Sequence, residues 1–170
     1  MTDGRILVIV HPGSACGSAN FHLGKYNAQA FRDGLVDEIE AWKGGVIVLS
    51  GELDDELAYS WYGRLGPAID DLLARAKAEG MPSARVKAHD PDQIRAIKRL
   101  LKTPKNQAPE YVVTGAWAYE DGTGCVYSVI EAIQSLDFKA DVSDTALSDA
   151  TPDDAEDGEE ETVNQVAQIS

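Results

Sequence analysis

Short runs of aliphatic residues alternate along this chain with longer stretches in which apolar residues recur every three or four positions. The first run, Arg5–Val10, holds five large aliphatic residues in succession, a pattern typical of a strand covered on both faces. Four later runs also have the composition of strands: Val46–Leu49, Ala84–Ala88, Tyr111–Thr114 and Phe138–Val142. The sequence therefore predicts five short strands.

The stretches between these runs predict four helices. They are Asn27–Trp42, a helix from Pro67 to Gly80, a helix that begins at Asp90-Pro91, and Cys125–Leu136. Phe31, Leu35 and Ile39 recur every four residues and form one apolar stripe with Trp42. Proline favours the first turn of a helix and glycine the position just after it, which fixes the expected ends of the second helix.

Strands that alternate with helices imply right-handed crossovers and a mainly parallel sheet. We therefore predict a Rossmann-like or flavodoxin-like fold, a three-layer α/β/α sandwich with about five strands in the order 2-1-3-4-5. Residues 1–149 would form a single α/β domain, followed by an acidic C-terminal tail at residues 150–170.

This architecture predicts a ligand site, because open parallel sheets bind ligands beyond the carboxyl ends of the strands, where the strand order reverses. Small or polar residues follow all five predicted strands: His11–Asn20, Glu52–Glu56, His89-Asp90, Thr114–Cys125 and Asp144-Thr145. We expect them to line one rim that binds a small molecule. The alternative is that they are ordinary polar loops without a shared role.

The loop after the first strand has the composition of an anion-binding turn. Gly13, Ser14, Gly17 and Ser18 lie between a strand and a helix, where backbone N–H groups and the positive helix end suit a phosphate or carboxylate. Their spacing matches neither the dinucleotide-binding fingerprint nor the P-loop, so the loop identifies no cofactor. The alternative is a tight turn that binds no ligand. His11 could act as a general base or as a hydrogen-bonded structural residue.

A metal site is the weaker interpretation of the histidines. His11, His22 and His89 could combine with Glu52 or Asp54, but no closely spaced histidine pair supports such a site. We therefore expect no metal.

Cys125 is the sharpest chemical candidate, because it begins a predicted helix directly after a glycine-rich turn. A helix N-terminus favours the thiolate, which is the nucleophilic form of cysteine. The alternative is a cysteine that only packs in the core.

A strand ending in Thr114-Gly115 leads to Cys125-Val126 at this helix start, and the next strand is followed by Asp144. In this arrangement Tyr111–Asp144, about 34 of the 170 residues, resembles a segment of the isochorismatase-like cysteine hydrolases. The resemblance implies that Cys125 is the nucleophile of a hydrolase acting on an amide or vinyl ether of a small molecule. With His11 as the possible general base after the first strand, the candidate catalytic residues are Cys125, His11 and Asp144.

Charge is unevenly distributed along the chain. The formal net charge is −14, and the eight acidic residues at positions 149–161, with no base among them, leave −6 for the remainder. Such an acidic protein is not expected to bind nucleic acid directly. The tail suits either a solvated segment or one that binds a partner.

Hydropathy and cysteine content favour a cytoplasmic protein. The apolar run at the start is too short for a signal peptide, and no run approaches the length of a membrane span. Cys16 and Cys125 lie near glycines and resemble reduced loop thiols rather than a disulfide framework.

The third predicted helix carries a basic strip, formed by Arg95, Lys98, Arg99, Lys102 and Lys105. A solvated helix face explains this strip most simply. The acidic tail is nevertheless a natural electrostatic partner for it, within one molecule or between subunits of a homo-oligomer. This pairing indicates an alternative function, a non-catalytic assembly or interaction protein whose tail binds a protein partner.

Overall fold

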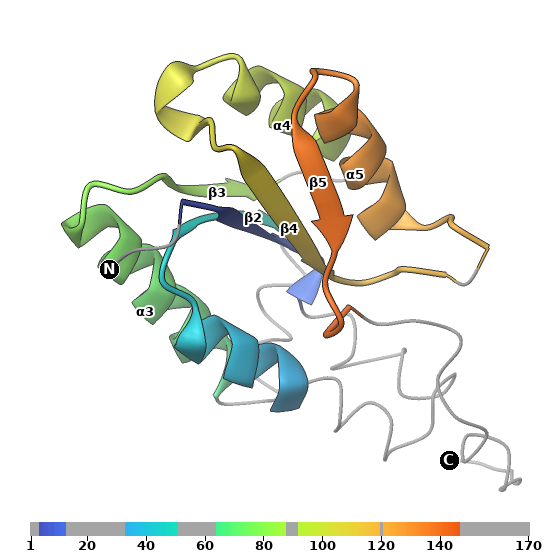
Figure 1. Cartoon of the computed structure of the whole chain (residues 1–170). Helices are drawn as coiled ribbons and strands as arrows, with labels where there is room; N and C mark the ends of the chain where they lie inside the picture. Colours follow the sequence, from blue (N-terminus) through green and yellow to red (C-terminus); the bar gives the residue numbers. More distant parts are fainter. Residues whose placement is uncertain (1–3, 13–32, 51–63, 88–91, 120, 147–170) are drawn as a thin grey trace, which may run out of the picture.

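The computed structural model describes residues 4–12, 33–50, 64–87, 92–119 and 121–146 (Figure 1). Its strands are β1 (Ile6–Val10), β2 (Gly45–Ser50), β3 (Ser83–Lys87), β4 (Glu110–Gly115) and β5 (Lys139–Val142). Its helices are α3 (Leu65–Ala78), α4 (Asp92–Leu101), the short 3-10 helix η2 (Pro104–Asn106) and α5 (Cys125–Gln134). A further helical segment covers residues 33–41. Each predicted strand is present, with ends within one residue of the prediction.

The five strands form one sheet in which every neighbouring pair is parallel. This confirms the predicted α/β class with a parallel sheet. The predicted strand order was wrong, because the order is β3-β2-β1-β4-β5. The third strand therefore lies outside β2, and β4 takes the place beside β1.

The polarity of the strands explains this order. β1 and β2 are buried along their whole length, and β4 is buried from Tyr111 onward. β3 is half-buried, and three of the four residues of β5 are exposed. Half-polar strands suit the edges of a sheet, whereas apolar strands suit its centre, where both faces are covered.

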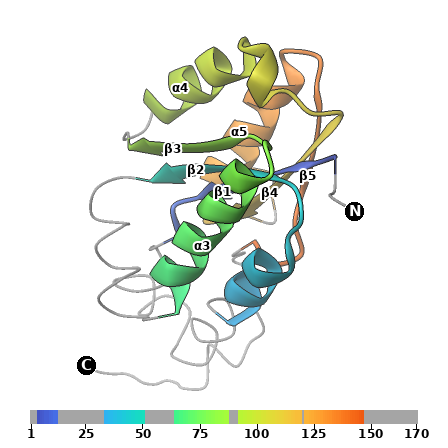
Figure 2. The ribbon, with the colours of Figure 1, turned by 90° about the vertical axis from the view of Figure 1, so that its left-hand side faces the viewer.

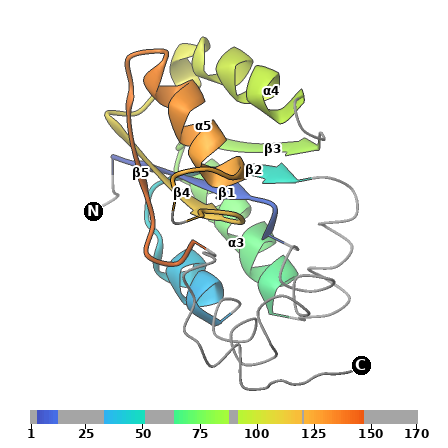
Figure 3. The ribbon, with the colours of Figure 1, turned by 90° about the vertical axis from the view of Figure 1, so that its right-hand side faces the viewer.

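Helices cover both faces of the sheet (Figures 2 and 3). Leu7 and Ile9 of β1 pack in one hydrophobic cluster with α3 and the 33–41 helix, on what we call the α3 face. Ile6, Val8 and Val10 pack in a second cluster with α4 and α5, on the α5 face. Alternate residues of a strand point to opposite faces, so one apolar run supplies both clusters.

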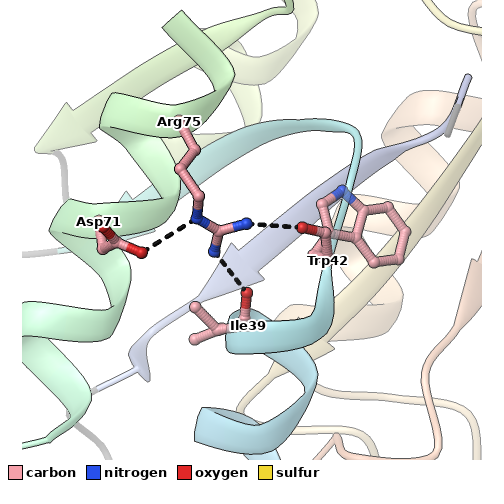
Figure 4. A network of polar contacts seen from close by, with 4 residues as sticks. All are labelled: Ile39, Trp42, Asp71 and Arg75. Carbon is pink, nitrogen blue, oxygen red and sulfur yellow. Dashed lines mark hydrogen bonds and ion pairs between the residues drawn. The ribbon is translucent and has the colours of Figure 1, made fainter. Parts of the chain in front are cut away.

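The predicted stripe of the first helix is confirmed where it can be followed. Leu35, Ile39 and Trp42 are buried on the α3 face, whereas residues 27–32 lie outside the described part of the chain. The guanidinium of Arg75, on α3, donates to the carbonyl oxygens of Trp42 at 2.9 Å and Ile39 at 3.2 Å, while its Nε–H donates to Asp71 at 3.0 Å (Figure 4). Arg75 thus satisfies carbonyls at the end of the 33–41 helix, where positive charge is favourable.

Helices α4 and α5 each bury one apolar face. Ile97 and Leu101 of α4 are buried on the α5 face. Four residues of α5 are buried there as well: Val126, Val129, Ile130 and Ile133. The expected start of α4, Asp90-Pro91, lies outside the described residues.

Tyr111 is the largest side chain that is fully buried in the described part of the chain. Its hydroxyl donates to the Asn106 carbonyl at 3.0 Å and accepts from the Ala108 N–H at 3.1 Å, and its ring meets Phe138 edge to face. Burial raises the pKa of Tyr111, and the hydrogen bond from Ala108 partly opposes this. The residue joins β4 to the loop that precedes it.

Among the helices that the structure describes, none has the length and apolar character needed to cross a membrane. Residues 147–170, which include the predicted acidic tail, lie outside the described part of the chain.

Candidate functional site

The strand order reverses between β1 and β4. The chain leaves β1 for helices on the α3 face, whereas β4 leads into α5 on the opposite face. In open parallel sheets the crevice at such a reversal is the usual ligand site. The observed order therefore puts the loops after β1 and β4 at this position, and the loop after β3, which carries His89, follows an edge strand instead.

Backbone contacts hold the ends of these two strands tightly together. Val10 pairs with Gly115, and the Ala116 N–H donates to the Val10 carbonyl at 2.8 Å. Gly115 has a φ of +104°, and a Cβ there would lie 1.9 Å from the Val10 oxygen. Only glycine fits this close approach. His11 follows Val10 directly, has a φ of +47°, and donates its N–H to Leu49 of β2 at 2.9 Å.

Cys125 is the first residue of α5, as predicted, and is half-buried. The Val126 N–H donates to the Trp117 carbonyl at 3.0 Å, which fixes the start of the helix against the chain leaving β4. The N-cap Gly124 has a φ of +105°, and a Cβ there would lie 2.4 Å from the Trp117 oxygen. Two glycines thus bring the Cys125 backbone close to the end of β4.

The connection from β4 to α5 is internally bonded. The Tyr119 N–H donates to Thr123 at 3.0 Å, and one Asp121 carboxylate oxygen accepts from both the backbone N–H and the hydroxyl of Thr123. The rings of Trp117 and Tyr119 stack at 5.6 Å with an interplanar angle of 13°. The Ala116–Trp117 peptide bond is cis. The connection thus presents two aromatic rings beside the strand reversal.

A second polar group of residues lies at the same edge, on the α3 face. The Glu38 carboxylate accepts from the Ser143 hydroxyl at 2.9 and 3.0 Å, and also from the Thr145 hydroxyl. The hydroxyls of Thr145 and the fully buried Thr114 are 2.6 Å apart. The sequence predicted that Thr114 and Thr145 lie on the rim. It predicted no role for Glu38, because Glu38 lies off the apolar stripe of its helix.

Asp144 lies between two members of this group and is itself exposed. It follows β5, an edge strand, and is therefore one strand further from the reversal than the residues after β1 and β4. Its neighbours Ser143 and Thr145 bond to Glu38 on the α3 face, whereas Cys125 packs against the cluster of the α5 face. The structure thus describes two separate polar environments at one edge of the sheet.

Several predicted site residues lie outside the described part of the chain: Gly13, Ser14, Gly17, Ser18, His22, Glu52, Asp54 and His89. Within the described ranges, no group of three or more His, Cys, Asp or Glu side chains is arranged to hold a metal ion.

A pocket of about 250 Å³ lies away from these two groups, between the segment that follows the 33–41 helix and the C-terminal half of α3. Its lining includes Trp42, Lys43, Arg75 and Glu79. β2 begins directly after residues 42–44, so the pocket lies near the amino ends of the strands, whereas Cys125 lies near their carboxyl ends.

Comparison of the chain with protein-family models, curated proteins and solved structures finds no match.

Proposed function

We propose that this protein binds a small molecule at the carboxyl edge of its sheet, between β1 and β4, and hydrolyses it with Cys125 as the nucleophile. One observation carries the proposal: backbone contacts connect the segments that bear His11 and Cys125. Val10, which precedes His11, accepts a hydrogen bond from Ala116, and the next residue, Trp117, accepts one from the first turn of α5. The two groups thus belong to neighbouring segments at the strand reversal, where ligands bind in such sheets.

The surroundings of Cys125 suit a nucleophilic thiol. The first turn of α5 carries no acidic residue, and its backbone N–H groups give this helix end a partial positive charge. We place the protein in the cytoplasm, where thiols stay reduced.

The reaction we propose is hydrolysis of a small amide. The Cys125 thiolate attacks the amide carbon to form a thioester, and the carbon–nitrogen bond breaks as the leaving amine takes a proton from the His11 imidazolium, which leaves His11 neutral for the next step. Water then attacks the thioester with His11 as the general base, which releases a carboxylic acid and restores the thiolate. Asp144, the third candidate, follows the neighbouring strand β5 and takes no step in this scheme. Residues 13–18 would hold an anionic part of the substrate.

Thiol reactivity tests the nucleophile directly. We would alkylate the full chain carrying Cys16→Ser with iodoacetamide between pH 6 and 9, with mass spectrometry as the readout. The Cys125→Ser chain is the matched control, since it retains the other cysteine. A thiol that acts as the nucleophile should react about tenfold faster than a cysteine peptide near pH 6.5. Reaction no faster than the peptide, or only after denaturation, would rule out a catalytic thiolate.

His11→Asn provides the second half of the test. If His11 is the base, this variant should still alkylate at Cys125 but should accumulate a covalent adduct with an activated ester such as p-nitrophenyl acetate, because deacylation slows. Rapid turnover of the ester by His11→Asn would remove His11 from the mechanism.

One observation favours the alternative, a non-catalytic interaction protein. Four basic side chains on or just after α4 form no ion pair with a carboxylate in the described residues: Lys98, Arg99, Lys102 and Lys105. Such a surface suits an acidic partner.

A further inference from the structure

The outer face of α4 is strongly basic in a protein whose net charge is −14. Gln93, Ala96, Ile97 and Leu101 are buried, so the helix presents its charged residues on the other side. The sequence from 93 to 109 contains no acidic residue. We define the α4 basic surface as Arg95, Lys98, Arg99, Lys102 and Lys105, of which only Lys98 is half-buried and the rest are exposed.

Three arginines outside this surface are neutralised by ion pairs. Arg64, Arg75 and Arg85 each form an ion pair with an acidic residue of a helix: Glu40, Asp71 and Asp70. On the α4 basic surface only Arg95 has such a partner, Asp92 of the same helix. Four adjacent positive charges therefore have no counter-charge within the described residues.

We propose that the acidic segment at residues 149–161 of the same chain binds the α4 basic surface. This segment carries eight acidic residues and no basic one, so its charge is complementary. The proposal concerns a different surface from the cysteine site and does not depend on it.

The connection between the two parts is long enough for this contact. Ala146, the last described residue, packs against the cluster of the α5 face, to which α4 also belongs. The next fifteen residues, 147–161, can span up to about 50 Å when extended. Helix α4 has ten residues and is about 15 Å long, so a short part of the acidic segment covers it.

Tethering favours this occupant over an external one. A segment of the same chain is present at an effective concentration of about 1 mM or more when its linker is short and flexible. An external polyanion such as nucleic acid would meet a body whose own net charge is −6, and it would also have to displace the tethered segment.

Carbodiimide cross-linking of the full wild-type chain tests the contact, because this reagent joins lysine amines to carboxylates that touch. We expect cross-links from Lys98, Lys102 and Lys105 to residues 149–161, at least about fivefold more abundant than those from the exposed Lys43, Lys77 and Lys139. The Debye screening length shortens from about 30 Å at 0.01 M salt to about 3 Å at 1 M. The yield of these cross-links should therefore fall several-fold over this range of salt concentration. Equal yields from the two lysine sets would overturn the proposal.

A mixture of 14N- and 15N-labelled chains distinguishes one molecule from two. Contacts within a chain give only cross-links between like isotopes. Cross-links that join unlike isotopes would show that a second copy supplies the acidic segment, which contradicts the proposal.

Two charge-matched variants give an independent readout. K98E/K102E/K105E removes the basic surface, and K43E/K77E/K139E changes the net charge equally elsewhere. Backbone amide resonances of residues 149–161 should shift from their wild-type positions in the first variant and stay near them in the second. The same response in both would mean that only overall charge matters.

A polyanion tests whether the surface is covered. Replacing the eight acidic residues by Asn or Gln should tighten heparin binding at least about tenfold, because the competing segment is lost. The same gain in a K98E/K102E/K105E background would place the heparin site elsewhere. Unchanged heparin affinity in the neutralised chain would show that the segment does not occupy the surface.

Discussion

The hydroxyl of Ser143 donates to the carboxylate of Glu38, with distances of 2.9 and 3.0 Å to its two oxygens. The two residues are 105 positions apart in the sequence. Ser143 follows β5 and Glu38 lies in the 33–41 helix, so the contact ties the helix to the β5 edge of the sheet. Thr145 adds a second hydroxyl to the same carboxylate and links it to the buried Thr114 of β4.

Replacing Glu38 by alanine should therefore destabilise the protein. The variant removes the charged acceptor of the Ser143 and Thr145 hydroxyls, which keep each other and Thr114 as neutral partners. Hydrogen bonds to a charged group contribute about 1.5–3 kcal/mol each, and the neutral partners offset part of this loss. We expect a loss of about 2 kcal/mol in the free energy of unfolding, measured with urea. A double-mutant cycle with Ser143→Ala should give a coupling energy of about 1 kcal/mol.

Glu40→Ala is the matched control for this experiment. Glu40 lies on the same helix, but it is about half exposed and pairs with the equally exposed Arg64. Exposed ion pairs contribute about 0–1 kcal/mol, so this variant should stay close to wild type. A loss as large as that of Glu38→Ala would mean that helix propensity or overall charge, not the hydroxyl contacts, explains the result.

Arg75 should stabilise the end of the 33–41 helix through its shape as well as its charge. A lysine at this position keeps the positive charge near the helix end but cannot reach the carbonyls of Ile39 and Trp42 together. We expect Arg75→Lys to lower the free energy of unfolding by about 1 kcal/mol, because at least one of these hydrogen bonds is lost. Arg64→Lys, at an exposed pair, should change it by less than about 0.5 kcal/mol. If Arg75→Lys matches wild type, charge alone accounts for the capping.

Most of the fold was predictable from the sequence because burial controls it. Aliphatic runs such as Arg5–Val10 can be satisfied only inside a sheet covered on both faces, and the spacing of Leu35, Ile39 and Trp42 suits one helix face. The strand order was predictable in principle, since the charged Ala84–Ala88 run suits an edge better than the apolar Tyr111–Thr114 run. The periodicity of a single strand does not reveal its place in the sheet, because that place depends on how apolar the strand is relative to the other strands.

The candidate site was predictable only in part. His11, Thr114 and Thr145 lie at or after the ends of predicted strands, so they were expected near the carboxyl ends of the sheet. The glycine-rich turn before Cys125 indicated that this residue begins a helix. The partnership of Glu38 with Ser143 left no local signal, because an acidic residue on a surface helix usually faces water. Contacts between residues a hundred positions apart depend on the tertiary packing.

Gly115 should be intolerant of any side chain. A Cβ there would lie 1.9 Å from the Val10 carbonyl oxygen, so alanine must push β1 and β4 apart at the strand reversal. We expect Gly115→Ala to cost more than about 3 kcal/mol or to prevent folding, since strain and a broken strand contact add together.

Gly122→Ala separates this clash from the effect of backbone conformation. Gly122 also has a positive φ, +84°, but a Cβ there would meet nothing within 4 Å among the described residues. We expect it to cost only about 1–2 kcal/mol, the usual penalty for a left-handed conformation. Equal losses in the two variants, measured by urea or thermal unfolding, would show that conformation rather than close approach makes Gly115 necessary.

Tyr111 predicts how stability depends on alkaline pH. Burial raises its pKa above the ordinary value of 10.0, so the unfolded chain releases this proton at a lower pH than the folded chain. The contribution of Tyr111 to stability is therefore complete below about pH 10 and is lost as the pH rises through the folded-state pKa.

Tyr111→Phe cannot titrate and should lack this loss, although it also loses its hydrogen bond to Asn106, worth about 1 kcal/mol. The difference in free energy of unfolding between wild type and Tyr111→Phe should thus be constant from pH 6 to 9 and should shrink above pH 10. Subtraction removes the lysines and the other tyrosines that titrate in the same range, so a difference that stays constant up to pH 11 would show that Tyr111 ionises equally well in the folded protein.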